Sequence, residues 1–365
     1  MRVCKRCVMD ETAPDIVFNA EGGCNYCSEL RGKLEAPVAS ANSLDTLIES
    51  IRKNGQGKPY DCIVGLSGGV DSSYTLHLVV ERGLRPLAVH LDNGWNSESA
   101  VHNIASVVRS LKVDLHTHVI EWKENRDLQR SMFAANVVDI EMLMDNAMLA
   151  VNYQQAKKYG LKYILAGSNT STEGMRMPWG WVHCKFDVRN IKAIHKRFGE
   201  RKIATHPLIS SYSFAWKRLI RRVRWISFLD YFVYNKDEAI SVLKDQHGYK
   251  PYPYKHYESV FTRFYQGYIL PKKFNVDKRK VHLSTLVMTQ QMSREAAIEL
   301  LKQSPYSSEH QQKVDYEFVL KKLGFTKEEF EEYIQAPAVS HREYPSEEWF
   351  FSLLKKVGRF LGVDR

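Results

Sequence analysis

The stretch that decides the fold runs from an apolar segment into a turn rich in glycine and serine: Tyr60-Asp61-Cys62-Ile63-Val64-Gly65-Leu66-Ser67-Gly68-Gly69-Val70-Asp71-Ser72-Ser73. The apolar segment predicts a buried strand over residues 60–66, and the turn opens into a predicted helix over residues 70–82. The two glycines let the backbone approach an anion, while the serine hydroxyls, the turn N–H groups and the helix N-terminus converge on phosphate oxygens. The spacing and the lysine of a Walker A loop are absent. A serine N-cap with Asp71 near the helix dipole is the simpler alternative.

Downstream of this turn, apolar strands alternate with amphipathic helices. The pattern predicts strands over residues 60–66, 85–91, 113–120 and 162–167, and helices over residues 70–82, 97–110 and 124–159. Continuous apolar strands between helices indicate a parallel sheet covered on both faces. The predicted fold class is therefore α/β with a parallel, doubly wound sheet. Helical patterns dominate after about residue 240.

Polar loops that contain glycine follow three of the predicted strands. Residues 67–73 follow the first strand, residues 92–95 the second and residues 167–174 the fourth. Ligands of parallel α/β sheets bind beyond the carboxyl ends of the strands, so we expect these loops to build one site. Asn93-Gly94 also suits a simple tight turn.

Composition bounds the class of protein. The chain has 365 residues with 44% hydrophobic and 26% charged residues, which is typical of a globular protein with two or three domains. No stretch approaches the roughly 18 apolar residues that a membrane span needs, and residues 1–4 begin no signal peptide, so we expect a cytoplasmic protein without stable membrane insertion. The net charge of +10 favours a polyanionic partner, whether nucleic acid, nucleotide-sugar or anionic lipid.

Four of the six cysteines form two Cys-x-x-Cys pairs, Cys4 with Cys7 and Cys24 with Cys27, separated by 16 residues. Each pair can place two thiolates on one ion, and the intervening chain is long enough to close a tetrahedron. Because cysteine fills all four positions, we expect a structural Zn²⁺ site. An iron–sulfur site or two redox pairs are the alternatives. Cys62 and Cys184 are expected to be core or incidental thiols.

The run Ser67-Gly68-Gly69-Val70-Asp71-Ser72 resembles the pyrophosphate loop, S-G-G-x-D-S, of the ATP pyrophosphatases, whose fold is of the adenine nucleotide alpha hydrolase-like type. The resemblance implies an enzyme that cleaves ATP between the α- and β-phosphates and passes AMP to a carbonyl oxygen. The residues expected to bind ATP are Ser67, Gly68, Gly69, Asp71, Ser72, Ser73, Asp92, Gly167, Asn169 and Glu173. The charge of the departing pyrophosphate needs Mg²⁺ held by carboxylates, for which Asp71 and Glu173 are the candidates. A capping or solvated role is the alternative for both carboxylates.

A second informative block runs from residue 255 to residue 284. It combines aromatic side chains with cations, carboxylates and hydroxyls: Lys255-His256-Tyr257-Glu258-Ser259, Thr262-Arg263-Phe264-Tyr265-Gln266, Asp277-Lys278-Arg279, His282 and Ser284. This composition suits a carbohydrate or nucleotide pocket. A salt-bridged interface between helices and sheet explains it equally well.

Taken together, the cysteine pairs, the three loops and this block resemble the N-acetyl sugar amidotransferases of bacterial surface-polysaccharide and pseudaminic-type sugar synthesis. The resemblance extends from Cys4 to about Leu300. It implies conversion of a sugar's acetamido group, free or nucleotide-linked, to an acetamidino group, with ATP adenylating the amide oxygen and ammonia displacing AMP. Asp71, Lys255, His256, Glu258 and Arg263 are the expected catalytic and pocket residues.

Ammonia needs a source, because at neutral pH it is mostly protonated. The chain shows no glutaminase nucleophile, since residue 2 is arginine and Cys184 lacks a glycine-flanked elbow. We therefore expect a separate glutaminase subunit and an ammonia-channel subunit. A basic helix predicted over Ala215 to Leu229, with Leu219, Val223 and Ile226 on one apolar face, is a candidate docking surface. A solvated face or a membrane-surface role is the alternative.

The main rival is a tRNA-modifying thiolation enzyme of the same superfamily, which the basic charge also suits. Val70 stands where many such enzymes carry lysine, and Cys62 and Cys184 are too few to hold a three-cysteine cluster. These features argue against a nucleic-acid substrate. A zinc-ribbon nucleic-acid binder without enzymatic activity leaves residues 67–73 unexplained. The expected domains are a zinc unit over residues 1–40, the ATP pyrophosphatase domain over 41–240 and a mostly helical substrate or partner region over 241–365.

Overall fold

The computed structural model describes residues 2–35, 41–252 and 257–360. Five strands form one sheet in the order β3-β2-β1-β4-β5, and every neighbouring pair is parallel. The strands are β1 (Cys62–Gly65), β2 (Pro86–Asp92), β3 (Asp114–Val119), β4 (Tyr163–Ala166) and β5 (Arg224–Ser227). Because β1 is central, the loops after β1, β2 and β4 meet at one edge of the sheet. The predicted parallel α/β fold is confirmed.

Alternate residues of the central strand point to opposite faces of the sheet. Val64 packs with Leu76 and Leu243 on one face, and Ile63 packs with Val151 on the other. Helices cover both faces, as the doubly wound pattern requires. The helices nearest the sheet are α2 (Ala41–Gly55), α3 (Val70–Glu81), α4 (Glu98–Leu111), α6 (Met142–Lys158) and α10 (Lys236–His247). No helix among the described residues is long and apolar enough to span a bilayer.

The predicted basic helix over Ala215 to Leu229 is wrong. A short helix, α9 (Ser211–Leu219), is followed by the edge strand β5. The Arg224 N–H donates to the Lys162 carbonyl at 2.7 Å, which joins the segment to the sheet. Strand pairing buries Val223 and Ile226, while Leu219 is 53% exposed, so these three side chains share no common face.

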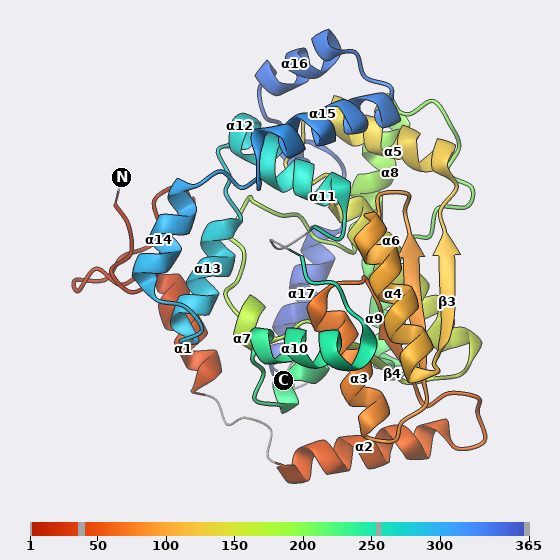
Figure 1. The fold of residues 1–365 in the computed structure, drawn as a ribbon. Helices are drawn as coiled ribbons and strands as arrows, with labels where there is room; N and C mark the ends of the chain where they lie inside the picture. Colours follow the sequence, from red (N-terminus) through yellow and green to blue (C-terminus); the bar gives the residue numbers. More distant parts are fainter. Residues whose placement is uncertain (1, 36–40, 253–256, 361–365) are drawn as a thin grey trace.

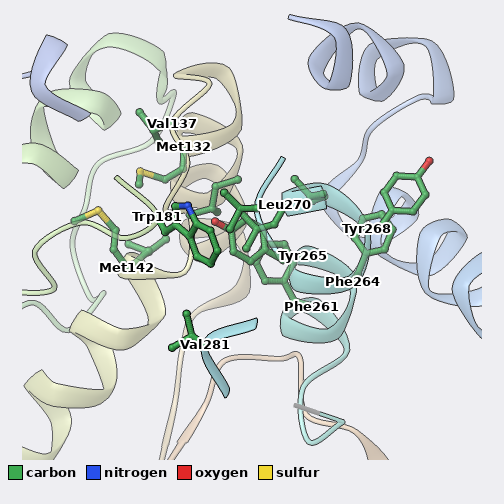
Figure 2. Packing of buried hydrophobic residues seen from close by; sticks show 14 of the residues in the cluster. Met132, Val137, Met142, Trp181, Phe261, Phe264, Tyr265, Tyr268, Leu270 and Val281 are labelled. Atoms are coloured by element: carbon green, nitrogen blue, oxygen red, sulfur yellow. The ribbon is translucent and has the colours of Figure 1, made fainter. Parts of the chain in front are cut away.

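Most of the remaining helices gather around a second core, whereas Phe228 and Leu229 pack in the sheet core and Ala297 packs in a smaller separate cluster. The remaining helices are α1 (Asn25–Leu34), α5 (Trp122–Ala134), α7 (Thr170–Glu173), α8 (Val188–Phe198), η1 (Phe228–Tyr231), α11 (Val260–Phe264), η2 (Tyr265–Ile269), α12 (Leu270–Phe274), α13 (Arg279–Met288), α14 (Arg294–Lys302), α15 (Glu309–Leu323), α16 (Lys327–Gln335), η3 (His341–Glu343) and α17 (Glu348–Phe360). Trp181, Phe261, Phe264 and Tyr265 lie in the second core (Figure 2). The same cluster includes Cys4, so the N-terminal unit shares its apolar core with the C-terminal helices.

The N-terminal unit lies beside α13 and α14, at the left of Figure 1. The Arg294 guanidinium donates to the carbonyls of Cys7 (3.0 Å) and Cys4 (2.9 Å). The Val8 N–H donates to Ser284 Oγ at 3.2 Å, and Lys280 pairs with Asp10 at 2.6 Å. These contacts tie the cysteine unit to the helix that carries His282 into the main cavity.

Candidate active site

A cavity of about 700 Å³ lies at the carboxyl edge of the sheet. The loops after β1, β2 and β4 all contribute to its lining, as the sequence predicts. The sequence-predicted residues that line it are Ser67, Gly69, Asp71, Ser72, Gly167, Glu173 and Glu258. These residues are far apart in sequence, so the fold brings a phosphate-type loop, two further carboxylates and the C-terminal region to one place.

The turn after β1 is shaped by its own hydroxyls. Ser67 Oγ lies 3.1 Å from Ser72 Oγ, and the Gly69 N–H donates to Ser67 Oγ at 3.3 Å. Gly68 has a φ of +84°, and a Cβ placed there would come within 2.9 Å of the Ala100 carbonyl oxygen. The helix α3 starts at Val70, so its first N–H groups face the turn. This arrangement is an anion cradle that only glycine permits at position 68.

Gly167 explains how the loop after β4 reaches the cradle. A Cβ at Gly167 would lie 2.6 Å from the Asp71 carbonyl carbon and 2.6 Å from the Ser72 nitrogen. The absence of a side chain therefore lets β4 end directly against the start of α3. Asn169 caps the short helix α7, with Oδ1 accepting from the Thr172 N–H at 2.8 Å. That helix carries Glu173 into the cavity lining.

Asp71 is oriented by a neighbour that the sequence did not single out. The Tyr234 hydroxyl donates a hydrogen bond to Asp71 Oδ1. Burial, together with the Asp71 carboxylate, raises the pKa of Tyr234 well above its usual range. The phenol therefore stays protonated and donates to the Asp71 carboxyl beside the cradle.

Glu258 reaches the cradle because the chain around it joins the loop after β2. The Ser97 N–H donates to the Glu258 carbonyl at 2.9 Å, and the Val260 N–H donates to the Trp95 carbonyl at 2.9 Å. A Cβ built on Gly69 would lie 4.0 Å from a Glu258 carboxylate oxygen. The C-terminal region thus places a carboxylate directly over the phosphate loop.

Several predicted residues lie outside the cavity lining: Gly68, Ser73, Asp92, Asn169 and Arg263. Ser73 is fully buried on the inner face of α3. Asp92 Oδ1 accepts a hydrogen bond from the Gly94 N–H at 2.9 Å. Asp92 therefore stabilises a tight turn at Asn93-Gly94, which was the alternative offered for this segment. Arg263 makes a two-pronged ion pair with Asp315 at 2.6 and 2.7 Å, which joins α11 to α15. The structure thus places Arg263 in a salt-bridged interface between helices, which was the alternative to the expected pocket role. Lys255 and His256 lie outside the described residues.

His282, which belongs to the 255–284 block predicted to form a pocket, also lines the cavity. Four other lining residues were not singled out from the sequence: Glu141 and Asp145 at the start of α6, together with Lys236 and Trp225. The His282 ring donates through Nδ1 to the Thr172 carbonyl at 3.1 Å, next to Glu173. The only sequence feature that points to Glu141 and Asp145 is their place at the start of a helix that follows β3 and α5. The chain has returned to the carboxyl edge of the sheet at that point.

The four cysteines of the N-terminal unit converge. All four Sγ atoms lie within 4.8 Å of one another, with Cys4–Cys27 at 3.8 Å, Cys7–Cys24 at 3.8 Å and Cys24–Cys27 at 3.6 Å. A tetrahedron of zinc–sulfur bonds of about 2.3 Å has edges of about 3.8 Å. The Cys24 N–H also donates to Cys4 Sγ at 3.3 Å. The group could therefore bind a single metal ion.

Two protein families match the chain. Residues 258–357 match the family described as "LPS biosynthesis protein WbpG-like, C-terminal domain", and residues 57–172 match "Thiamine biosynthesis protein (ThiI)". The first match begins at Glu258, and the second contains the phosphate loop. No curated protein matches the chain.

Three solved structures show the range of structural similarity. NMN synthetase from Francisella tularensis is 14% identical, with 63% of this chain and 99% of that chain covered and a TM-score of 0.30. A 4-thiouridine synthetase–RNA complex with bound ATP is 19% identical, with 52% and 42% covered and a TM-score of 0.30. The U34-tRNA thiolase NcsA from Methanococcus maripaludis, described with its [4Fe-4S] cluster, is 13% identical, with 83% and 89% covered and a TM-score of 0.33.

Proposed function

We propose that this chain, in which a PP-loop domain of the ThiI type precedes a WbpG-like C-terminal domain, is an ATP-dependent, AMP-forming amidotransferase. It converts the acetamido group of a sugar, free or nucleotide-linked, to an acetamidino group in surface-polysaccharide synthesis. One observation carries the proposal: the WbpG-like region begins with Glu258, whose carboxylate stands over the phosphate loop. An ATP site and a second substrate's site therefore share one cavity.

The anion cradle after β1 suits the β- and γ-phosphates of ATP, and Asp71 and Glu173, which line the same cavity, would hold Mg²⁺. Mg²⁺ held by these carboxylates would neutralise charge on the phosphates. The amide oxygen of the sugar attacks the α-phosphorus, and the bond to pyrophosphate breaks. Ammonia then attacks the amide carbon, the carbon–oxygen bond breaks, and AMP leaves with the former amide oxygen. The amidine product retains the extra proton as an amidinium.

The cavity lining beyond the phosphate loop has the chemistry expected for binding a polar substrate that contains a ring. Trp225 offers an aromatic face, and Glu141, Glu258 and His282 offer hydrogen-bonding groups. Pockets that combine an aromatic face with a few polar groups are typical of sugar and nucleotide sites. Glu258 takes the role of contacting the sugar or the adenylated intermediate.

The metal at the cysteine group is proposed to be Zn²⁺ in a structural role. Four thiolates leave no open coordination position. The unit contacts the elements that line the cavity through α13 and through the hydrogen bond from Lys33 to the Gly174 carbonyl, next to Glu173. Separate glutaminase and ammonia-channel subunits supply the nucleophile.

A thiolation enzyme acting on tRNA is the alternative, favoured by the ThiI match and the net charge of +10. Sulfur transfer of that kind needs a reactive thiol. Cys62 is fully buried in β1, and burial raises the pKa of its thiol. It is therefore unsuited to carry sulfur.

Product analysis tests the proposal. The protein is incubated with ATP, Mg²⁺, ammonium chloride and a panel of acetamido sugars with and without nucleotide carriers. Mass spectrometry should find one sugar in which NH replaces oxygen, with AMP and pyrophosphate released in equal amounts. AMP release that depends on added tRNA, with every sugar unchanged, would instead establish the alternative.

A further inference from the structure

A second cavity, of about 380 Å³, shares no lining residue with the main cavity. Much of its lining is apolar, including Val138, Trp181, Phe274 and Val276. The polar lining comprises His183, His341, Thr12, Ser340 and the ion pair of Arg342 with Glu348. A cavity of this volume has room for a small neutral or singly charged molecule.

Two short segments connect the linings of the two cavities, and we call these segments the wall. Val138 lines the second cavity and Glu141 lines the main one, and three residues of chain span at most about 11 Å between Cα atoms. A second segment makes the same passage, from Val276 in the second cavity to His282 in the main one. Lys278 of that segment pairs with Glu141 at 3.2 Å. Charged side chains therefore fill the wall.

The charges in this wall are unequal. Lys185 Nζ lies 2.7 Å from Asp139 Oδ2 and 2.9 Å from Asp145 Oδ2, and Lys278 holds Glu141. Three carboxylates thus share two ammonium groups among the described residues. Asp139 is fully buried, and its Oδ1 has no hydrogen-bond partner. An extra negative charge and an unpaired buried acceptor both favour a small cationic donor.

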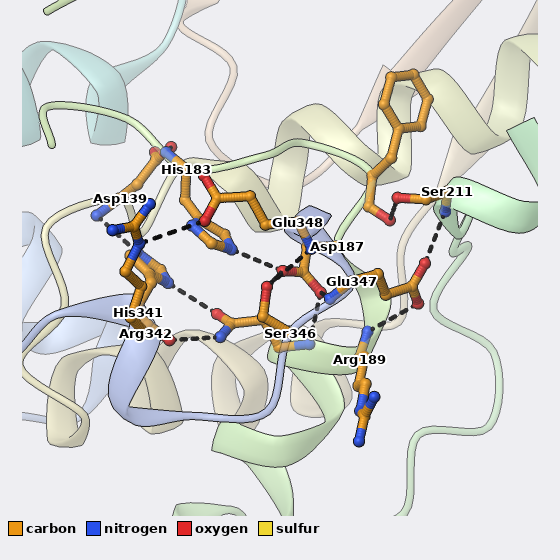
Figure 3. Close-up of polar contacts among 12 residues, drawn as sticks. Asp139, His183, Asp187, Arg189, Ser211, His341, Arg342, Ser346, Glu347 and Glu348 are labelled. Atoms are coloured by element: carbon orange, nitrogen blue, oxygen red, sulfur yellow. Dashed lines mark hydrogen bonds and ion pairs between the residues drawn. The ribbon is translucent and has the colours of Figure 1, made fainter. Parts of the chain in front are cut away.

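The neighbouring histidines do not supply that cation. The Asp139 N–H donates to His341 Nε2 at 3.2 Å, and His341 Nδ1 donates to Asn190 at 2.8 Å, so this ring is neutral (Figure 3). His183 stacks on it with ring centroids 4.3 Å apart and pairs with Asp187 at 2.8 Å. The histidine pair leaves the charge on the wall uncompensated.

We propose that this group, Asp139, Glu141, Asp145, Lys185 and Lys278, is an ammonium site that is loaded from the second cavity and delivers ammonia to the main one. The inference rests on the proposed function. Ammonium donates one N–H to Asp139 Oδ1. An N–H bond then breaks as its proton moves to a carboxylate oxygen of Asp145, which lines the main cavity. The freed lone pair attacks the adenylated carbon, and the amidine nitrogen later takes the proton back from Asp145.

Blocking the second cavity tests the route. Ala338 is exposed and lines this cavity, so larger side chains can be placed there without disturbing the core. In assays with ammonium chloride as the nitrogen source, Ala338→Phe and then Ala338→Trp should raise the KM for ammonium progressively, about 5-fold for tryptophan, with the KM for ATP unchanged. Ala338→Ser is the matched control. A tryptophan variant with the wild-type KM for ammonium would overturn the route.

Asp139→Asn tests the site itself, because it removes the negative charge of Asp139 at nearly constant volume. The KM for ammonium should rise about 10-fold, while thermal unfolding shows that the fold is retained. If the wild type makes amidine and neither Asp139→Asn nor Ala338→Trp alters this KM, the ammonium site is wrong and the proposed function stands. If the wild type makes no amidine at any ammonium concentration, both are wrong.

Discussion

At the scale of single residues, the phosphate loop depends on one carboxylate held in place by one phenol. Asp71→Asn should lower the rate of AMP formation by about 100-fold or more, because a Mg²⁺ ligand and a negative charge are lost together. Tyr234→Phe keeps the carboxylate and removes only the hydrogen bond described above. Its rate should fall by about 10-fold. Equal rates for Asp71→Asn and wild type, measured as AMP release, would remove Asp71 from the site.

The close approach of Gly167 to the start of α3 predicts that a side chain at this position would disturb the cradle. Gly167→Ala places a methyl group 2.6 Å from the backbone of residues 71 and 72, so the cradle must shift. We expect a rise of about 10-fold or more in the KM for ATP. Gly32→Ala is the matched control, since a Cβ at Gly32 meets nothing within 4 Å and alanine favours the helix. Binding of ATP followed by calorimetry should separate the two variants, and identical affinities would contradict the close packing.

The buried side chain of His341, which accepts a hydrogen bond from the Asp139 N–H, makes the stability of the fold depend on pH. Burial lowers the pKa of His341 to about 3, whereas in the unfolded chain it is about 6.5. The unfolded state therefore binds a proton at pH 5.5 that the folded state does not. Stability should fall as the pH falls below about 6.5, by roughly 1 kcal/mol per pH unit from this residue. His341→Gln should remove that part of the slope in urea unfolding between pH 7 and pH 5. An unchanged slope would show that His341 takes up its proton in the folded state.

At the scale of elements, the cysteine unit supports α13 rather than the chemistry. Cys24→Ser should abolish binding of one Zn²⁺ and destabilise the fold by several kcal/mol. Because Val8 and Asp10 contact α13 through Ser284 and Lys280, the KM for the sugar should rise more than that for ATP. Metal analysis, thermal unfolding and steady-state kinetics measure the three effects. Normal zinc content in the variant would exclude the four-thiolate site.

The elements show what the sequence could and could not predict. Strands β1, β2 and β4 are apolar and were predictable for that reason, whereas most residues of β3 are exposed. The ThiI match over residues 57–172 covers these four strands. Leu219, Val223 and Ile226 fit a helical spacing, which hides β5, whereas pairing with β4 and the hydrogen bond from Arg224 to Lys162, just before β4, select a strand. Arg263 was placed in the pocket because composition cannot reveal its partner Asp315, 52 residues away.

At the scale of the whole molecule, the fold brings three parts of the chain to one cavity. The PP-loop domain contributes the anion cradle, the WbpG-like region contributes Glu258 and His282, and α6 contributes Glu141 and Asp145. Of the residues predicted for the first contribution, Ser67, Gly69, Asp71 and Ser72 line the cavity, whereas Gly68 and Ser73 do not. Glu258 and His282 of the second contribution belong to the block singled out from the sequence. The third contribution, Glu141 and Asp145, depends on where α6 begins relative to the edge of the sheet. The local sequence pattern does not encode that position.

The measurement that tests this account most directly follows the amide oxygen. The reactive acetamido sugar is labelled with ¹⁸O in its amide carbonyl and incubated with the protein, ATP, Mg²⁺ and ammonium chloride. If ATP adenylates that oxygen, the label must appear in the phosphate group of AMP, and the sugar product must contain nitrogen in its place. AMP free of ¹⁸O, formed while the sugar changes, would contradict adenylation of the amide and with it the central claim.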